Sequence, residues 1–288
     1  MALDGLAIIG ESINDSVPST HKLFEQNDIN GLKELAKLQD SKGAAYIDVN
    51  VGSNSPDFMA DMVRAIQSVT AKPLAIDSPD FETAKAGLEA YDIKKASGNI
   101  PILNSIAQSR SEMFDLLKKY KFIPILMVSE KEDNGSATQN YTVEETYDTA
   151  KVMLSKAKQI TDITNDNIII DVGIAPIASD MQGMTKRTIG SIAKINSDKL
   201  FKGIHMSVGL SNFTVMLPPK TKEGLPIKSS LESAFLTMTM KNGLDMVIGS
   251  VKRKYRILDE DHPAIICLKD VLDLDGLEVL MRVQKFYS

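Results

Sequence analysis

Polar side chains recur at the ends of short apolar segments along this chain, and most of them are carboxylates or carboxamides. The set comprises Glu11, Asn14, Asp48, Asn50, Asp77, Asn104, Ser105, Asp171, Ser211 and Asn212. It contains acids, amides and hydroxyls but no histidine. Three or four converging carboxylates can bind a hard cation such as Mg²⁺. They suit equally well a flat heterocycle that is rich in N–H donors.

An amino-pyrimidinone is such a heterocycle, because one of its edges carries an amide-like N–H, an exocyclic amine and a carbonyl. A carboxylate accepts two of these donors side by side. An asparagine amide matches a neighbouring donor–acceptor pair. Aspartate together with asparagine therefore suits the edge of a pterin ring.

Each polar residue also has a purely structural explanation. An Asp or Asn directly after a strand commonly caps the next helix or forms a turn. This explanation suits Asp48 and Asn50 as well as a binding role does. Ser211 and Asn212 follow Gly209, where a tight turn is the alternative. The recurrence at several segment ends, rather than any single residue, favours a binding site.

Eight apolar segments precede or contain these residues at a fairly regular interval. They cover residues 6–10, 45–49, 73–76, 100–103, 123–128, 167–170, 203–208 and 246–248. Each segment is short, rich in Ile, Val or Leu, and flanked by turn-forming residues. This pattern is typical of parallel strands that are buried on both faces.

Stretches with helical spacing lie between the apolar segments. In 29–42, leucines recur every third residue at Leu32, Leu35 and Leu38. The stretch 142–160 opens with TVEE, which is a capping-box pattern. The other predicted helices cover 60–69, 81–90, 109–120, 231–242 and 277–286.

Eight strands alternating with helices predict one α/β domain over residues 1–288, a (β/α)8 TIM barrel. An open doubly wound sheet is the structural alternative. In a barrel, active-site residues gather at the carboxyl ends of the strands, where the polar set is expected to lie. The segments 130–140 and 217–226 are predicted to be long loops, which are often functional in compact domains.

Composition is ordinary for a soluble enzyme, with 25% charged and 43% hydrophobic residues. The net charge is -5 and the basic residues are dispersed, so nucleic acid is not an expected partner. The single cysteine, Cys267, lies in an apolar segment and is expected to be a buried hydrophobe. No secretory signal and no apolar run of roughly 20 residues is visible. We therefore expect a cytoplasmic protein with no membrane partner.

The motifs resemble those of the pterin-binding methyltransferase family, and within it the methyltetrahydrofolate:corrinoid protein methyltransferases. The matching stretches are GESIN (10–14), DVNVG (48–52), IDS (76–78), NS (104–105), ID (170–171) and GLSN (209–212). They occur in the family's order and at comparable spacing over nearly the whole chain. The folate-binding module of cobalamin-dependent methionine synthase and dihydropteroate synthase are more distant relatives.

The resemblance implies a pterin-binding barrel that moves a methyl group between a corrinoid protein and N5 of tetrahydrofolate. Tetrahydrofolate and 5-methyltetrahydrofolate are then the folate substrates, and the partner protein carries the cobalamin. The expected direction is from methylcorrinoid to tetrahydrofolate, in a demethylation pathway. The family also implies a homodimer.

The resemblance assigns the pterin ring to Asp77, Asn104 and Asp171. Asp48 and Asn50 belong to the same predicted folate-binding set. All five residues stand at predicted strand ends, which is where a barrel binds its ligand.

Asn212 matches the family's mobile asparagine, which hydrogen-bonds the folate N5 region, and is the expected catalytic residue. Gly209 and Ser211 match neighbours of that contact. Glu11 and Asn14 match supporting positions that orient the residues touching the ligand.

Two departures distinguish this chain within the family. The stretch after 209–212 lacks the Gln and Arg of the corrinoid methyltransferase, and Lys220 or Lys222 is the nearest cation. Ser129 and Glu130 stand where the relative has an asparagine. Both departures favour a subfamily with another corrinoid partner, or one that works mainly in the demethylation direction.

Three other functions fit part of the pattern. Dihydropteroate synthase shares the pterin-binding residues but needs cations for a diphosphate leaving group, and 252–254 is the nearest basic stretch. A non-catalytic folate-binding or corrinoid-docking protein would keep the pterin residues without methyl transfer. A metal-dependent lyase or aldolase would need a Lys or His at a strand end. His205 is more consistent with a wall residue.

Overall fold

A computed structural model describes residues 3–288 of the chain. Within that range eight parallel strands form one sheet in the order β10-β1-β2-β3-β4-β5-β8-β9. Their bounds are β1 (Ala7–Asn14), β2 (Tyr46–Asn50), β3 (Leu74–Asp77), β4 (Ile102–Ile106), β5 (Ile123–Met127), β8 (Ile169–Asp171), β9 (His205–Ser207) and β10 (Met246–Gly249). All eight predicted apolar segments thus contribute a strand to the sheet.

The sheet closes on itself where β9 meets β10. Ile248 N donates to Val208 O at 3.0 Å, and Asp245 N donates to Met206 O at 3.4 Å. Gly209 and Ile248 form a parallel bridge just beyond β9. The predicted (β/α)8 barrel is therefore confirmed, and the open doubly wound sheet is excluded.

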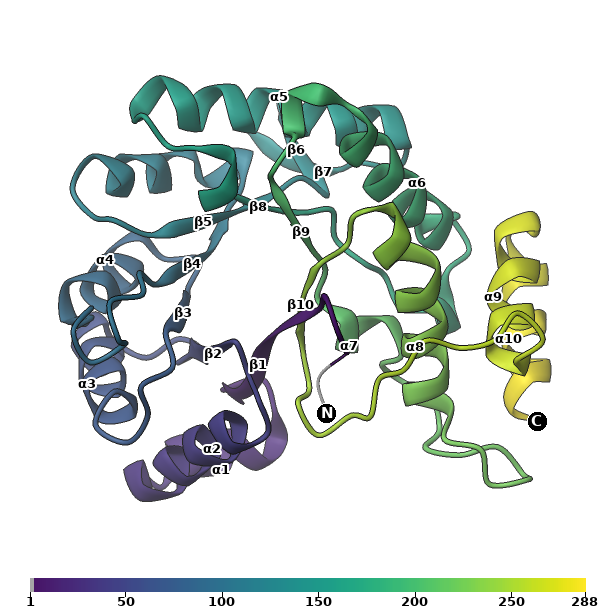
Figure 1. Ribbon diagram of the computed structural model, residues 1–288, viewed down its shortest axis with the longest axis horizontal. Helices are drawn as coiled ribbons and strands as arrows, with labels where there is room; N and C mark the ends of the chain where they lie inside the picture. The colour runs from purple at the N-terminus through teal and green to yellow at the C-terminus, as the bar shows by residue number, and fades with distance from the viewer. Residues whose placement is uncertain (1–2) are drawn as a thin grey trace.

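Helices surround the barrel, as Figure 1 shows. Their bounds are α1 (Pro18–Glu25), α2 (Ile29–Ser41), α3 (Pro56–Ile66), α4 (Phe81–Ala90), α5 (Val143–Ile160), α6 (Met184–Ser197), α7 (Leu210–Phe213), α8 (Ile227–Thr239), α9 (Pro263–Asp273) and α10 (Leu277–Tyr287). Short 3₁₀ helices are η1 (Gln108–Lys118), η2 (Asn165–Asn167), η3 (Ile177–Ser179), η4 (Lys199–Phe201) and η5 (Met240–Asn242). Across residues 3–288, none of the helices combines the length and the apolar character that crossing a membrane requires.

The alternation of side chains along the strands divides the buried residues into two cores. A large outer cluster packs between the barrel and its helices. A smaller inner cluster fills the barrel with Ile9, Ala75, Ile102, Ile125, Ile169 and Met246. Since side chains two positions apart face the same way, the next inward residues form a layer nearer the carboxyl ends. In the same strand order these are Glu11, Asp77, Asn104, Met127, Asp171 and Ile248.

The predicted loop 130–140 is wrong, because most of it forms an antiparallel hairpin. Strands β6 (Glu130–Asp133) and β7 (Ser136–Gln139) pair in register around Asn134 and Gly135. Both turn residues have positive φ, 52° and 79°, which an Asn-Gly turn accommodates well. The Asn-Gly pair was the available signal for a hairpin in the sequence.

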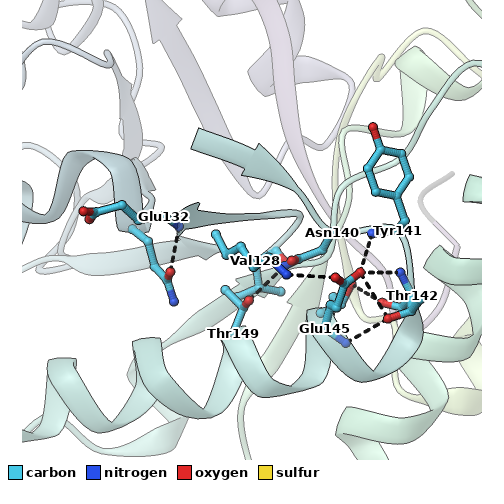
Figure 2. Close-up of polar contacts among 10 residues, drawn as sticks. Val128, Glu132, Asn140, Tyr141, Thr142, Glu145 and Thr149 are labelled. Carbon is cyan, nitrogen blue, oxygen red and sulfur yellow. Dashed lines mark hydrogen bonds and ion pairs between the residues drawn. The ribbon is translucent and has the colours of Figure 1, made fainter. Parts of the chain in front are cut away.

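Polar contacts at the base of the hairpin attach it to the barrel (Figure 2). The buried Asn140 donates through Nδ2 to Val128 O at 3.0 Å and to Thr149 Oγ1 at 2.8 Å. Lys131 Nζ pairs with Glu145 Oε1 of α5 at 2.8 Å. The hairpin is therefore held against both the end of β5 and the first turns of α5.

The predicted capping box is present at the start of α5 (Figure 2). Thr142 Oγ1 accepts from Glu145 N at 3.1 Å, and Glu145 Oε2 accepts from Thr142 N at 3.1 Å. The Glu145 side chain therefore satisfies the helix terminus and also anchors the hairpin through Lys131.

We expect Thr142→Ala to lower the free energy of unfolding by about 1 kcal/mol, because it removes the acceptor for an unpaired helix N–H. Thr142→Ser retains the hydroxyl and is the matched control. Urea unfolding of the three proteins measures the effect. Equal unfolding free energies for Thr142→Ala and Thr142→Ser would contradict this role for the cap.

Candidate functional site

A row of polar residues crosses the carboxyl ends of four neighbouring strands. The backbone register places Asn14 beside Asn50, Asn50 beside Asp77, and Asp77 beside Asn104. These positions are far apart in the sequence, so barrel closure and strand register bring them together. The structure thus gathers this part of the predicted set along one rim.

Two aspartates and two asparagines of this rim form a cluster of two hydrogen-bonded pairs. Asn50 Nδ2 donates to Asp77 Oδ2 at 2.8 Å, and Asn104 Nδ2 donates to Asp48 Oδ1 at 3.3 Å. The carboxyl groups of Asp48 and Asp77 lie close enough for the charge on Asp77 to affect the pKa of Asp48. The two pairs therefore lie side by side at the rim.

Burial governs the protonation of the two aspartates. It raises the pKa of Asp77 to about 6, although the hydrogen bond from Asn50 and the charge on Arg110 oppose the rise. Burial also raises the pKa of Asp48 well above its ordinary value, and the charge on Asp77 raises it further. Two adjacent buried carboxyls cannot easily both ionise. Burial and the neighbouring charge therefore both favour the neutral form of Asp48.

A cavity of about 520 Å³ opens beside this cluster. Four residues of the predicted site line it: Asn104, Asp171, Gly209 and Asn212. The other lining residues are Met127, Ser129, Gln139, Gly173, Ile174, Ala175, Pro176, Arg187 and Ile248. Asp48 meets this lining through its bond with Asn104. The predicted residues therefore divide into a group in the cavity wall and a group that supports it.

Asp171 is held on both of its oxygens. Oδ1 accepts from Gly173 N at 2.7 Å, and Oδ2 accepts from Ser207 Oγ at 2.9 Å. Burial raises the pKa of Asp171 to about 6, against the lowering effect of these bonds and of the Arg187 charge. Each carboxylate oxygen has a second lone pair, so Asp171 can accept two further N–H donors.

Arg187 is a cavity residue that sequence reasoning missed. It reaches from α6, is 3% exposed, and donates through Nη1 to Val172 O at 2.5 Å. Its buried Nε has no hydrogen-bond partner among residues 3–288. Burial lowers the pKa of Arg187 to about 10, so the guanidinium stays charged beside Asp171. Because α6 was not among the predicted helices, nothing in the sequence placed this residue at the rim.

Gln139 is a second cavity residue that was missed, because it belongs to the unpredicted hairpin. It is the last residue of β7 and lines the cavity beside Ser129. The hairpin therefore brings a carboxamide to a cavity that also contains Asn104 and Asp171 of the barrel strands.

Asn212 lies in α7, a helix of four residues that follows β9. A Cβ atom at Gly209 would stand 2.9 Å from Asn212 Nδ2, so this glycine leaves room for the folded-back amide. Ser211 Oγ donates to Glu11 Oε1 of β1. Glu11 and Ser211 thus support the segment that carries the exposed Asn212.

Two asparagines make the turn contacts that were the alternative to binding. Asn14 Oδ1 accepts from Ser16 N at 2.9 Å and from Ser16 Oγ at 2.6 Å. Asn50 Oδ1 accepts from Gly52 N at 2.8 Å while its Nδ2 bonds to Asp77. Asn14 therefore shapes the turn after β1, and Asn50 combines a turn contact with the rim cluster.

His205 lies at the opposite end of the barrel from these residues. It begins β9, and its Nδ1 is 2.6 Å from Asp245 Oδ2. Both residues line a separate cavity of about 560 Å³ at the amino ends of the strands. No group of three or more His, Cys, Asp or Glu side chains within 3–288 is arranged to hold a metal ion.

Comparison with known proteins relates most of the barrel to a pterin-binding family. The sequence profile of the family described as pterin binding enzyme matches residues 13–249. A curated relative from Eubacterium limosum, named methylcorrinoid:tetrahydrofolate methyltransferase, is 28% identical over 251 residues. That alignment covers 84% of this chain and 84% of the relative.

Solved structures show the same fold. A dihydropteroate synthase from Xanthomonas albilineans, solved with 4-aminobenzoic acid, has a TM-score of 0.59 and 16% identity. This match covers 94% of this chain and 92% of that one. The dihydropteroate synthase from Thermus thermophilus also has a TM-score of 0.59, with 15% identity and 95% of each chain covered. At such identities the likeness establishes the barrel fold alone.

The raised pKa of Asp171 predicts that this carboxyl weakens the unliganded fold at neutral pH. With a folded pKa of about 6 against an ordinary 3.8, it binds its proton more tightly when folded. Its contribution to stability is therefore present at pH values below the unfolded pKa and is lost as the pH rises through the folded pKa.

We expect Asp171→Asn to raise the free energy of unfolding at pH 8 by about 1–3 kcal/mol. The gain should disappear at about pH 3.5, where the wild-type carboxyl is also neutral. Urea unfolding at both pH values measures the difference. A gain of equal size at both would show that ionisation of Asp171 is not its source.

Proposed function

This chain belongs to the pterin-binding enzyme family, as its motifs predicted, and we propose that it transfers a methyl group between a corrinoid protein and N5 of tetrahydrofolate. One observation carries the proposal: a single cavity brings together the buried Asp171, the buried Asn104 and the exposed Asn212. The name of the Eubacterium limosum relative describes this reaction and supports the proposal.

The cavity suits a pterin in size and in chemistry. Small-molecule sites commonly enclose about 300–1,000 Å³, a range that includes this cavity. Asp171 keeps free lone pairs for two N–H donors, as described above. Asn104 uses its Nδ2 on Asp48, which leaves its carbonyl oxygen available to the ligand. We assign the pterin edge to Asp171 and Asn104, with Asp48 fixing the orientation of Asn104 and Asp77 beside it in the neighbouring strand.

The reaction requires N5 of the folate to gain or lose positive character, because an amine anion is a poor leaving group. The partner's cobalamin supplies the centre that gives or accepts the methyl group, so this chain needs no nucleophilic side chain. We assign to Asn212 the hydrogen bond at N5, which stabilises the charge that changes in the transition state. The same side chains serve both directions of transfer.

We propose transfer from methylcorrinoid to tetrahydrofolate as the working direction, in keeping with the name of the relative. The same direction is favoured by the two departures from the family motifs, the missing Gln and Arg after 209–212 and the serine at position 129. The hairpin residue Gln139 supplies a carboxamide at the cavity mouth, in a chain that lacks the glutamine of the corrinoid methyltransferases after 209–212. We also propose that the protein is a homodimer, that it works in the cytoplasm, and that its partner is a corrinoid protein.

A spectroscopic transfer assay tests the proposed reaction. Purified protein is mixed with methylcobalamin and tetrahydrofolate, and separately with cob(I)alamin and 5-methyltetrahydrofolate. We expect folate-dependent interconversion of the methylcob(III)alamin and cob(I)alamin spectra in both mixtures. Tight tetrahydrofolate binding without any spectral change would favour a non-catalytic folate-binding protein. Formation of dihydropteroate from a pterin diphosphate and 4-aminobenzoate would favour a synthase.

We expect Asn212→Ala to lower turnover by about 10²–10³-fold, the usual effect of removing one donor aimed at transition-state charge. Folate affinity should change far less, because the bond matters most in the transition state. Asn212→Asp keeps the shape without the N–H donor and should lose turnover similarly. Equal losses of turnover and of affinity, measured by steady-state kinetics and calorimetry, would remove this role from Asn212.

A further inference from the structure

Asn212 is flanked by two hydroxyl side chains that each bind a carboxylate from a different part of the barrel. Ser211 Oγ donates to Glu11 Oε1 of β1, and Thr214 Oγ1 donates to Glu232 Oε1 of α8. Thr214 and Glu232 are both fully buried, at 0% exposure. The predicted site contained Glu11 and Ser211, whereas Thr214 and Glu232 were absent from it.

The backbone of the segment that carries Asn212 does little to hold it in place, although Leu210 and Phe213 pack into the core at 0% exposure. Helix α7 spans only four residues, and one turn of helix is not stable by itself. Its following backbone bonds are long, with Thr214 N to Ser211 O at 3.4 Å and Val215 N to Asn212 O at 3.3 Å. At Met216 the chain turns into the left-handed region, with φ of 68°. Side-chain contacts must therefore set the position of Asn212.

Glu232 is fully buried and belongs to a charge network that reaches both flanks of Asn212. Arg253, from the chain after β10, lies with Nε 2.8 Å from Glu232 Oε2. The same guanidinium lowers the pKa of Glu11 against the stronger effect of burial. Burial raises the pKa of Glu232 to about 7, against the lowering effect of the Arg253 charge. One arginine thus faces the two carboxylates that hold α7.

This network is not explained by stability alone. Taking the Glu232 carboxylate out of water is costly, even with Arg253, whose side chain stays 25% exposed, as its partner. Buried ion pairs can often be replaced by apolar side chains without loss of stability. A barrel of this size has an extensive apolar core elsewhere. The location of the pair, directly beneath the segment that carries Asn212, therefore indicates a positioning role.

We propose that Glu232, held by Arg253, is a positioning residue that fixes Asn212 through Thr214. It acts on the reaction through α7 and does not itself contact the folate or the methyl group. Misplacing a reacting group by about 1 Å can cost as much as 10²-fold in rate, so a hydrogen bond behind α7 can control turnover. This inference rests on the proposed function of Asn212.

The test replaces the hydroxyl that transmits the contact. Thr214→Val removes the donor at nearly constant volume, and Thr214→Ser restores it. Thr239→Val is the matched control, since Thr239 is also 0% exposed and donates only to Phe235 O of its own helix. We expect Thr214→Val to lower kcat by at least about 10-fold with unchanged folate affinity. Thr214→Ser and Thr239→Val should retain turnover.

A double-mutant cycle separates positioning from a general structural effect. If Thr214 acts through Asn212, Thr214→Val should lower kcat no further in an Asn212→Ala background. Glu232→Gln keeps the acceptor but removes the charge that Arg253 faces, and should show a smaller loss that also vanishes in that background. Equal losses in both backgrounds, or wild-type turnover in Thr214→Val, would overturn the proposal.

Hydrogen exchange gives a second readout that does not depend on activity. We expect Thr214→Val to accelerate amide exchange in residues 210–214 by about 10-fold, as for the loss of one hydrogen bond. Thr239→Val should leave that segment unchanged. Unaltered exchange in 210–214 would overturn the proposal even if the wild-type protein transfers no methyl group. Absence of transfer in the wild type, with accelerated exchange in Thr214→Val, would instead reject the proposed function.

Discussion

The apolar layer inside the barrel determines where every polar group of the site can lie. The interior of the barrel is filled by an apolar layer that consists of Ile9, Ala75, Ile102, Ile125, Ile169 and Met246. The next inward side chains lie directly against this layer. Acids placed against this layer lose solvation on one side. Burial accordingly raises the pKa of Glu11, Asp48, Asp77 and Asp171. Carboxyl groups next to this apolar layer are poorly solvated, so hydrogen bonds from N–H donors of a ligand stabilise their charged form.

Much of the fold was accessible from the sequence because parallel strands in a barrel are buried on both faces. That burial produces short continuous apolar segments, and each of the eight contributed a strand. The ends of the apolar segments were also sufficient to locate the rim, because polar residues begin where the apolar interior ends. Element bounds were less accurate. Strand β1 runs to Asn14 because a register shift between Gly10 and Ile13 prolongs its pairing.

The remainder of the site depended on geometry that residue types do not encode. Strand register decides that Asp48 bonds to Asn104, whereas Asp171 bonds to Ser207 from the neighbouring strand. Arg187 reaches the cavity from α6, a helix that was not among the predicted ones. Gln139 reaches it from a hairpin whose Asn-Gly turn was overlooked. Glu232 is distant in sequence from Glu11, and only the folded chain shows that both support α7.

The hairpin has a separate consequence for how such a barrel can diversify. It is attached through Asn140 and Lys131 to β5 and α5, and it touches the cavity through Gln139. No strand of the barrel pairs with it, since β6 and β7 form their own two-stranded sheet within the described range, residues 3–288. Changes in its length or tip can therefore alter the cavity wall at Gln139 while the strands that carry the acids stay unaltered. The hairpin and the acid-bearing strands can thus vary in sequence independently of each other.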